Sequence, residues 1–340
     1  MTDKGVLRSI EFRNDHDYSL QLNRWYLKPI GAWPEINESS VVENIFVPVQ
    51  ILICWTMAIF IGGPCLLYIL FEAENIPAKL NAIGPLFHRA MGSVNYLTLL
   101  KRRRDLRDCI KHMEKDWQLI QRIDNREIMI QYAKFGRLIS GICGVIMQGS
   151  TMLFSITRAM KTVTIVIDNQ TMTMYPMTCP SYQKFIDTRF SPMNEIVLSV
   201  QFLSIFVIGA STAGICSLAA VFATHACGQL NILYKRLYEL DKNNEKKNNS
   251  AEQKMAVIVE HHLRILSLIS RMESIMHNAC LVEIIGSTIS ICLLGYYSIM
   301  HWANFDGAKI TSYVIVYVSL SFNLFIFCYI GEILTEQCKN

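Results

Sequence analysis

The chain has 340 residues, of which 51% are hydrophobic and only 18% are charged, with a formal net charge of +4. Soluble globular chains are about one quarter charged, and here the charges are missing in long blocks. This pattern excludes an ordinary soluble enzyme, a disordered chain and a secreted disulfide scaffold. Five stretches without Asp, Glu, Lys or Arg reach the roughly 20 residues that an α-helix needs to cross a bilayer. The sequence therefore predicts an all-α, polytopic membrane protein.

Six membrane crossings are expected after a polar amino-terminal segment. Residues 1–44 form that segment, and residues 45–340 form the transmembrane domain. We expect crossings at about residues 45–71, 76–100, 138–160, 195–224, 280–305 and 310–331. Helices are expected rather than a β-barrel, because the apolar runs are long and do not alternate with period two.

Four ionisable residues stand out in or beside these crossings. The second crossing contains His88 and Arg89 as well as Lys79, which lies near one end and can reach the membrane surface. Glu283 lies at the start of the fifth crossing. Ionisable groups in lipid are by default candidates for function. For His88, Arg89 and Glu283 we favour a structural polar contact between helices, or a place at the cytoplasmic boundary for Glu283.

The distribution of Lys and Arg sets the orientation. The connections 101–137 and 225–283 are rich in both, whereas 158–194 and 306–309 contain few. Positive charge concentrates on the cytoplasmic side of membrane proteins, so the amino terminus is predicted to be cytoplasmic. The basic run 101–104 fits the membrane flank and anionic lipid. Because it lacks interleaved aromatic residues, nucleic acid is not an expected partner.

Motifs for chemistry are absent from the sequence. The eleven cysteines include no CxxC pair and no Cys/His spacing typical of zinc, and metalloprotease, phosphate-loop and serine-hydrolase motifs are also missing. We therefore expect no cofactor and no enzymatic activity. The sequon at Asn169 lies in the predicted outer connection and is a possible glycosylation site.

Apolar stripes at helical spacing extend beyond the membrane on the cytoplasmic side. They indicate long helical extensions of the fourth and fifth crossings, joined across the polar break 241–251, and a similar helix within 105–135. Their members are Leu230, Leu233, Leu237, Leu240, Val257, Leu263, Leu266 and Ile269, and then Leu106, Ile110, Met113, Trp117, Ile120 and Ile123. Internal packing and a cytoplasmic assembly surface both explain such stripes.

The outer halves of the predicted helices are rich in aromatic residues and methionine, interleaved with small hydroxyl residues. The residues concerned are Met147, Met152, Phe154, Phe202, Phe206, Tyr296, Tyr297, Trp302, Tyr313 and Tyr317, with Ser150, Thr151, Ser155 and Ser204. Such a lining suits a small apolar ligand held by dispersion and one or two weak hydrogen bonds. Taken singly, each residue also fits ordinary helix packing or an interfacial anchor.

Several segments resemble motifs of the insect odorant receptors, in the right order and spacing. They are Asp17 to Trp25, Leu27 to Pro34, Ser191 to Leu198 with Gln201 to Ser204, His225 to Leu230 (HACGQL), and Phe327 to Glu332 (FCYIGE). The first two resemble the amino-terminal signature of hymenopteran members. The others resemble the entry to the fourth helix, its exit, and the end of the sixth.

This resemblance implies a ligand-gated cation channel subunit in the plasma membrane of olfactory neuron dendrites. It implies a heterotetramer with a shared co-receptor, with the cytoplasmic helical extensions forming the main subunit contact. A small volatile odorant would bind in the outer half of the bundle, between the second, third, fourth and sixth helices. The residues that we expect there are Phe87, Met91, Met152, Ser155, Phe202, Phe206, Tyr313 and Tyr317.

The resemblance also implies a seventh, pore-lining helix after the FCYIGE motif. The sequence given ends at Asn340, so we expect six of seven helices and no conduction by this chain alone. A gustatory receptor of the same superfamily is an alternative. A secondary transporter is another, with Gly62-Gly63-Pro64 and Gly84-Pro85 as possible helix breaks, although no matched second half is visible.

Overall fold

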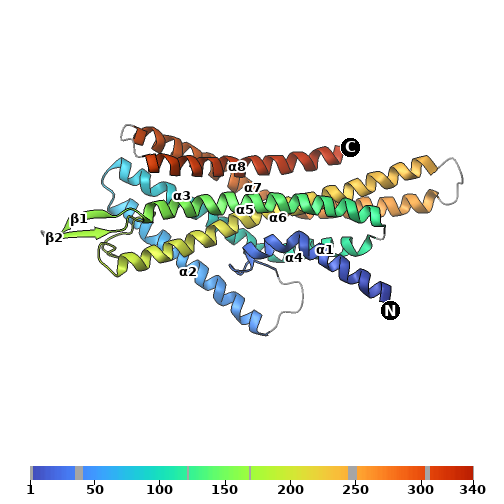
Figure 1. The fold of residues 1–340 in the computed structure, drawn as a ribbon, viewed down its shortest axis with the longest axis horizontal. Helices are drawn as coiled ribbons and strands as arrows, with labels where there is room; N and C mark the ends of the chain where they lie inside the picture. The colour runs from blue at the N-terminus through green and yellow to red at the C-terminus, as the bar shows by residue number, and fades with distance from the viewer. Residues whose placement is uncertain are drawn as a thin grey trace.

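The protein is an elongated bundle of long helices (Figure 1). The computed structural model describes residues 3–34, 41–120, 122–167, 170–243, 251–302 and 307–339. In chain order the elements are α1 (Asp3–Leu27), α2 (Val41–Phe71), α3 (Ile76–Lys101), α4 (Arg103–Leu119), α5 (Ile123–Ala159), β1 (Val163–Ile167), β2 (Gln170–Met174), α6 (Met193–Asn243), α7 (Ala251–Trp302) and α8 (Gly307–Lys339).

Five of these helices, α2, α5, α6, α7 and α8, are long and apolar enough to cross a membrane. The helix α6 is the central one, since 89% of its most apolar stretch is buried, compared with 11% for α2. The remaining predicted crossing corresponds to α3, which has 26 residues and packs against α2, α6 and α7. That length is sufficient to span. Because α3 carries Lys79 and Arg89, its crossing stays a prediction from sequence and packing.

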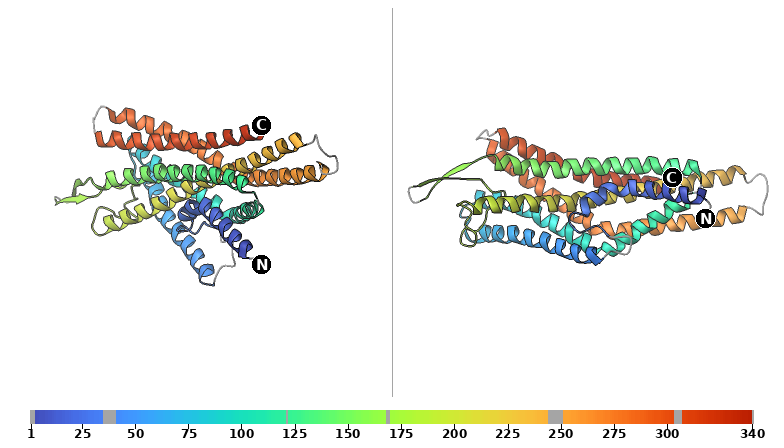
Figure 2. Two further views of the ribbon diagram at one scale, coloured as in Figure 1. Left: turned by 45° about the vertical axis from the view of Figure 1, so that its right-hand side comes forward. Right: turned by 60° about the horizontal axis from the view of Figure 1, so that its bottom comes forward.

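The two ends of the bundle differ as the predicted topology requires. The amino terminus, the carboxyl terminus and the adjoining ends of α6 and α7 lie toward one end, and the β1–β2 hairpin lies at the other (Figures 1 and 2). The helical extensions predicted in 225–283 are confirmed, since α6 continues to Asn243 and α7 begins at Ala251.

The amino-terminal segment is helical, which the sequence patterns did not predict. Its helix α1 packs against α4, α5 and α6 and ends in a tight turn at Gly31, whose φ of 68° suits glycine. After the exposed residues Lys28 and Pro29, the chain is buried at Ile30, Gly31, Ala32, Trp33 and Pro34. The Tyr96 hydroxyl donates to the Ile30 carbonyl (2.7 Å) and Arg103 donates to the Trp33 carbonyl (3.0 Å). The amino-terminal signature therefore docks onto the bundle.

A two-stranded antiparallel hairpin interrupts the all-α expectation. Strand β1 pairs with β2 from Val163 opposite Met174 to Ile167 opposite Gln170. The β1 sequence, VTIVI, consists only of β-branched residues, which favour extended structure. Since the hairpin lies in the predicted outer connection, the membrane part of the fold is still helical. Asn169, the possible glycosylation site, falls outside the described residues.

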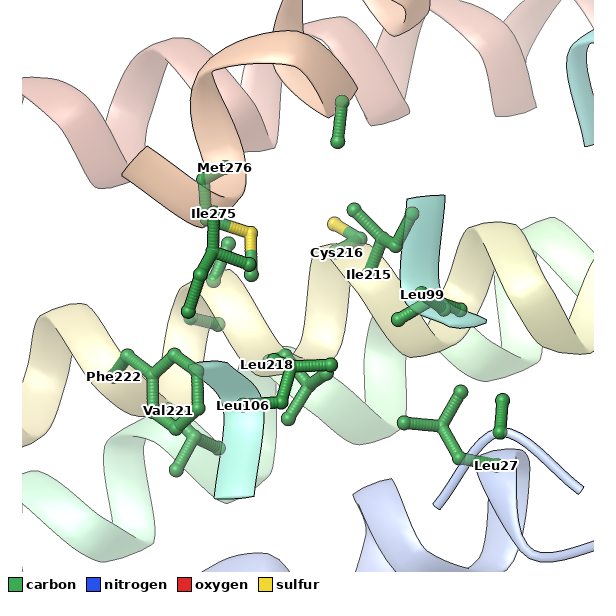
Figure 3. Packing of buried hydrophobic residues seen from close by; sticks show 14 of the residues in the cluster. Leu27, Leu99, Leu106, Ile215, Cys216, Leu218, Val221, Phe222, Ile275 and Met276 are labelled. Carbon is green, nitrogen blue, oxygen red and sulfur yellow. The ribbon is translucent and has the colours of Figure 1, made fainter. Parts of the chain in front are cut away.

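The main hydrophobic core surrounds α6. Figure 3 shows Ile215, Leu218 and Phe222 of α6 beside residues of α1, α3, α4 and α7. Small residues on α6 allow this close approach. A Cβ atom at Gly214 would overlap the Leu27 side chain of α1.

The predicted cytoplasmic stripes differ in burial between α4 and α7. On α4 the stripe is internal, since Leu106, Ile110, Met113 and Trp117 are all buried. On α7 internal packing does not hold for most of the stripe: Val257, Leu263 and Leu266 are exposed, and the buried apolar side chains are Ile258, Ile265 and Leu268. The hydrophobic spacing of α7 fits either face, and only the position of α6 decides which face is covered.

Candidate ligand-binding site

The site is a cavity of about 110 Å³ in the half of the bundle nearer the hairpin. Five helices and the loop after β2 enclose it. Its lining residues are Asn81, Gly84, Pro85, His88 and Arg89 of α3, Thr151, Phe154, Ser155 and Arg158 of α5, Thr178 of the loop, Ile205 of α6, Ser290, Leu293, Leu294 and Tyr297 of α7, and Tyr313, Val316 and Leu320 of α8. A pocket mostly apolar, with a few polar groups, is typical of small-ligand sites.

Aromatic rings form one wall of this cavity. Tyr297 of α7 stacks on Tyr313 of α8 with ring centroids 6.2 Å apart, and Phe154 of α5 lies 6.5 Å from Tyr313. The Tyr297 hydroxyl donates to the Leu80 carbonyl, which ties α7 to α3. The guanidinium of Arg158 lies 5.3 Å from the centre of the Phe154 ring. Three helices are therefore joined through ring contacts at the position where a ligand would sit.

A buried arginine forms the polar part of the lining. Arg89 is only 5% exposed, and its Nη1 donates to the Ser204 hydroxyl of α6 (2.9 Å). Its Nε donates to the Cys179 sulfur of the outer loop (3.0 Å). Gln201 holds the same loop, accepting from the Thr178 hydroxyl (2.8 Å) and donating to the Cys179 carbonyl (2.7 Å). The loop thus closes the cavity through bonds to α3 and α6.

A smaller cavity of about 40 Å³ lies next to the first and shares His88, Thr151, Val316 and Leu320 with it. Glu283 of α7 lines this cavity and is 2% exposed. Its carboxylate accepts from Asn323 of α8 (2.6 Å) and from Asn95 of α3. The interpretation of Glu283 as a structural polar contact between helices is therefore confirmed. Among the residues that the structure describes, no group of three or more His, Cys, Asp or Glu could hold a metal ion.

The family assignment rests on the match of a family model. The model described as 7tm Odorant receptor matches residues 75–340, which include all of the cavity-lining residues. The chain belongs to the odorant receptor family. It is thus a multi-pass membrane receptor rather than an enzyme, and the resemblance seen in the sequence motifs is confirmed.

A curated relative supports the odorant receptor assignment over part of the chain. Odorant receptor 13a of Drosophila melanogaster is 28% identical over 139 residues, which cover 37% of this chain and 33% of that protein. The matched segment therefore spans about a third of the relative's length.

Solved structures share the fold. The insect olfactory receptor OR5 from Machilis hrabei aligns with a TM-score of 0.69 and 16% identity, over 94% of this chain and 82% of that chain. The same receptor in complex with eugenol gives a TM-score of 0.67 and 15% identity, over 97% and 82%. At this level of identity the likeness establishes the odorant receptor fold alone.

The structure separates the predicted ligand-binding residues into two groups. Ser155 and Tyr313 line the larger cavity, and Met91 lines the smaller one. The other five are not among the lining residues of either cavity: Phe87, Met152, Phe202, Phe206 and Tyr317. Phe206 and Tyr317 are 42% and 47% exposed on the outer surface of the bundle. Contact between these five residues and a ligand in the cavity is not supported by their positions.

Sequence reasoning passed over four residues that the structure brings to the larger cavity. The sequence places Tyr297 and Phe154 in the aromatic lining that suits an apolar ligand and marks Arg89 as ionisable, but none of the three is among the residues expected to contact the ligand. Arg158 is one of the few basic residues of the connection 158–194 and is not expected at the site. The spacing of Phe154, Ser155 and Arg158 on α5 was a usable signal, since residues three and four apart share a helical face.

Proposed function

We propose that this chain is an odorant-binding subunit that gates a cation channel together with a co-receptor in the plasma membrane of olfactory neurons. The observation that carries the proposal is the enclosed, aromatic-walled cavity between α3, α5, α6, α7 and α8 in a chain of the odorant receptor family. The OR5 structure in complex with eugenol shows that a receptor of this fold takes a small organic ligand.

Gating is proposed to follow from the way the cavity joins separate helices. Tyr297 and Tyr313 place α7 and α8 in ring contact, and the Tyr297 hydroxyl connects α7 to α3. A ligand between these helices makes contacts that depend on their relative positions. If it binds one arrangement more tightly than another, it shifts the population toward that arrangement.

The co-receptor contact is proposed for the cytoplasmic part of α7. This part exposes apolar side chains on one face: Met255, Val259, Leu263 and Leu266. A contiguous apolar face on a helix beyond the membrane favours a protein partner. The resemblance to insect odorant receptors, in which these extensions form the main subunit contact, supports the co-receptor as that partner.

Substitution of a cavity tyrosine tests odorant binding. The chain is expressed with a co-receptor, and odorant-evoked currents are recorded over a chemically broad panel. We expect Tyr313→Ala to weaken or reorder the responses, because it removes a ring that contacts both Tyr297 and Phe154. The control is Tyr329→Ala on the same helix, whose exposed ring stacks on Phe325 outside the cavity. Identical dose–response curves for Tyr313→Ala and the unmodified chain would contradict the proposal.

A further inference from the structure

The larger cavity carries an excess of positive charge. Two guanidinium groups, those of Arg89 and Arg158, line it, whereas none of its lining residues in the described part of the chain is an aspartate or a glutamate. The remaining lining is apolar, aromatic or neutral. Burying a charge without a counter-charge is costly. Arg89 is buried and Arg158 is half-buried, so water compensates these two cations only in part.

Neutral groups hold Arg89 in place but do not exhaust its donors. Its Nε and Nη1 donate to Cys179 and Ser204, and no hydrogen bond involves its Nη2 in the described structure. Arg158 is placed over the Phe154 ring and makes no ion pair with a described carboxylate. Both guanidinium groups therefore keep donors for a ligand that enters the cavity.

Two nearby groups, Glu283 and Cys179, could compensate the positive charge of Arg89 and Arg158, but neither does so fully. Glu283 belongs to the smaller cavity, and each of its oxygens already accepts from an asparagine amide. Hydrogen bonds from Cys65 and Arg89 lower the pKa of the Cys179 thiol. A Cys179 thiolate would balance Arg89 alone. Arg158 would still leave the cavity with one uncompensated cation.

We propose that this cavity selects small amphiphilic acids, whose carboxylate is held by Arg89 and Arg158 while the apolar body packs against Tyr297, Tyr313 and Phe154. Guanidinium groups bind carboxylates through strong, charge-assisted hydrogen bonds. The aromatic wall supplies the dispersion contacts for the rest of the molecule. The inference rests on the proposed function and names the ligand class of that same site. A neutral alcohol of equal length is a weaker ligand, and an amine is repelled.

Direct binding tests this preference without relying on channel opening. The purified full chain is placed in lipid nanodiscs at neutral pH. Binding of tritiated hexanoic acid and of tritiated 1-hexanol is measured separately by scintillation proximity, and uptake into empty nanodiscs is subtracted. Unlabelled hexylamine serves as a competitor. We expect the acid to bind about tenfold or more tightly than the alcohol, and hexylamine to displace neither.

Matched substitutions assign the preference to the two arginines. Arg158→Gln and Arg89→Gln are each expected to weaken hexanoic acid binding by about tenfold or more while 1-hexanol binding changes by less than about twofold. Retained alcohol binding also shows that a variant is folded, and Arg158, less buried than Arg89, gives the safer variant. Arg158→Lys should restore part of the loss, because it keeps the charge without the fork geometry.

The control is Arg137→Gln, also on α5, where Arg137 donates to the Tyr18 carbonyl and Gln21 and does not line the larger cavity. It should leave both affinities unchanged. The inference is overturned if the acid binds no more tightly than the alcohol, or if the arginine variants weaken both ligands equally. Binding of 1-hexanol or eugenol without a preference for the acid would overturn this inference alone. Failure of hexanoic acid, 1-hexanol and eugenol to bind would overturn the proposed function as well.

Discussion

The helix α4 and the first half of α7 have the same amphipathic sequence pattern, but the apolar stripe is buried on α4 and exposed on α7. Both carry apolar residues at helical spacing beyond the membrane. On α4 these residues are covered by α1, α6 and α7, and Trp117 is 1% exposed. On α7 the face with Leu263, which is 61% exposed, stays uncovered. An amphipathic stripe therefore shows that a partner exists, but only tertiary structure shows whether the partner lies within the same chain.

A buried polar cluster accompanies the covered stripe. Asp116 of α4 accepts from Arg264 of α7 (2.7 Å), and its second oxygen lies 3.0 Å from His225 Nε2 of α6. Burial pushes the pKa of Asp116 upward, but the hydrogen bond with His225 and the charge of Arg264 outweigh it and hold the pKa below its usual range. His225 begins the HACGQL motif, so this motif has a structural role at the junction of three helices.

The largest expected effect comes from breaking this cluster. Asp116→Ala leaves His225 and Arg264 without their shared acceptor, and loss of one partner of a buried ion pair costs about 3–5 kcal/mol. The free energy of unfolding in mixed micelles measures this loss. Asp105→Ala on the same helix is the control, because the pair of Asp105 with Arg102 is partly exposed and contributes about 1 kcal/mol or less. Equal losses for the two variants would show that the cluster does not stabilise the covered face.

Acidification is expected to have the second-largest effect, by weakening the packing that covers α4. His16 of α1 is 3% exposed, and burial lowers its pKa from 6.5 to about 4, with Asp17 opposing this shift. Between these two values the unfolded chain binds the proton more strongly than the folded chain. The contribution of neutral His16 to the free energy of unfolding is therefore fully present above about pH 6.5. It decreases as the pH falls toward 4, by up to about 3 kcal/mol.

Melting temperatures of the purified chain between neutral and acidic pH measure this dependence. We expect His16→Gln to flatten the pH profile, and the exposed residue His262, replaced in the same way, to leave it unchanged. A His16→Gln profile as steep as that of the unmodified chain would assign the acid sensitivity to other groups.

The smallest effect on folding is expected on the uncovered face. Leu263→Ser should change the free energy of unfolding of the isolated chain by no more than about 0.5 kcal/mol. Leu268→Ala on the same helix is fully buried and should cost about 2–5 kcal/mol. In co-purification with the co-receptor, Leu263→Ser should lower the yield of complex, as the proposed contact requires. A large loss of stability in Leu263→Ser would mean that this face is covered within the chain after all.

The membrane helices were predictable because the bilayer acts on each segment separately. A charge-free run of sufficient length has few alternatives to a spanning helix, and five such runs became α2, α5, α6, α7 and α8. The α1 helix was not predictable in this way. Which of its residues are buried is decided by contacts with segments more than one hundred residues away. One example is the hydrogen bond from the Tyr26 hydroxyl to the Ser140 carbonyl.

The chemical character of the cavity lining was predictable from the sequence, but the identity of the lining residues was not. Tyr313 and Tyr317 lie one turn apart on α8, yet Tyr313 is 5% exposed and Tyr317 is 47% exposed. Their spacing shows that they share a helical face, whereas the rotation of α8 against α7 decides which of them enters the cavity. The same rotation places Tyr297 of α7 in the wall of the cavity beside Tyr313, and only the structure shows this.

The position of α1 has a consequence for the order of biogenesis. Its Leu27 side chain fills the space above Gly214, so the surface that receives the first helix is completed only when α6 has been synthesised. The packing of α1 on α4 and α5 can therefore form before its packing on α6, which needs a segment made almost two hundred residues after Leu27.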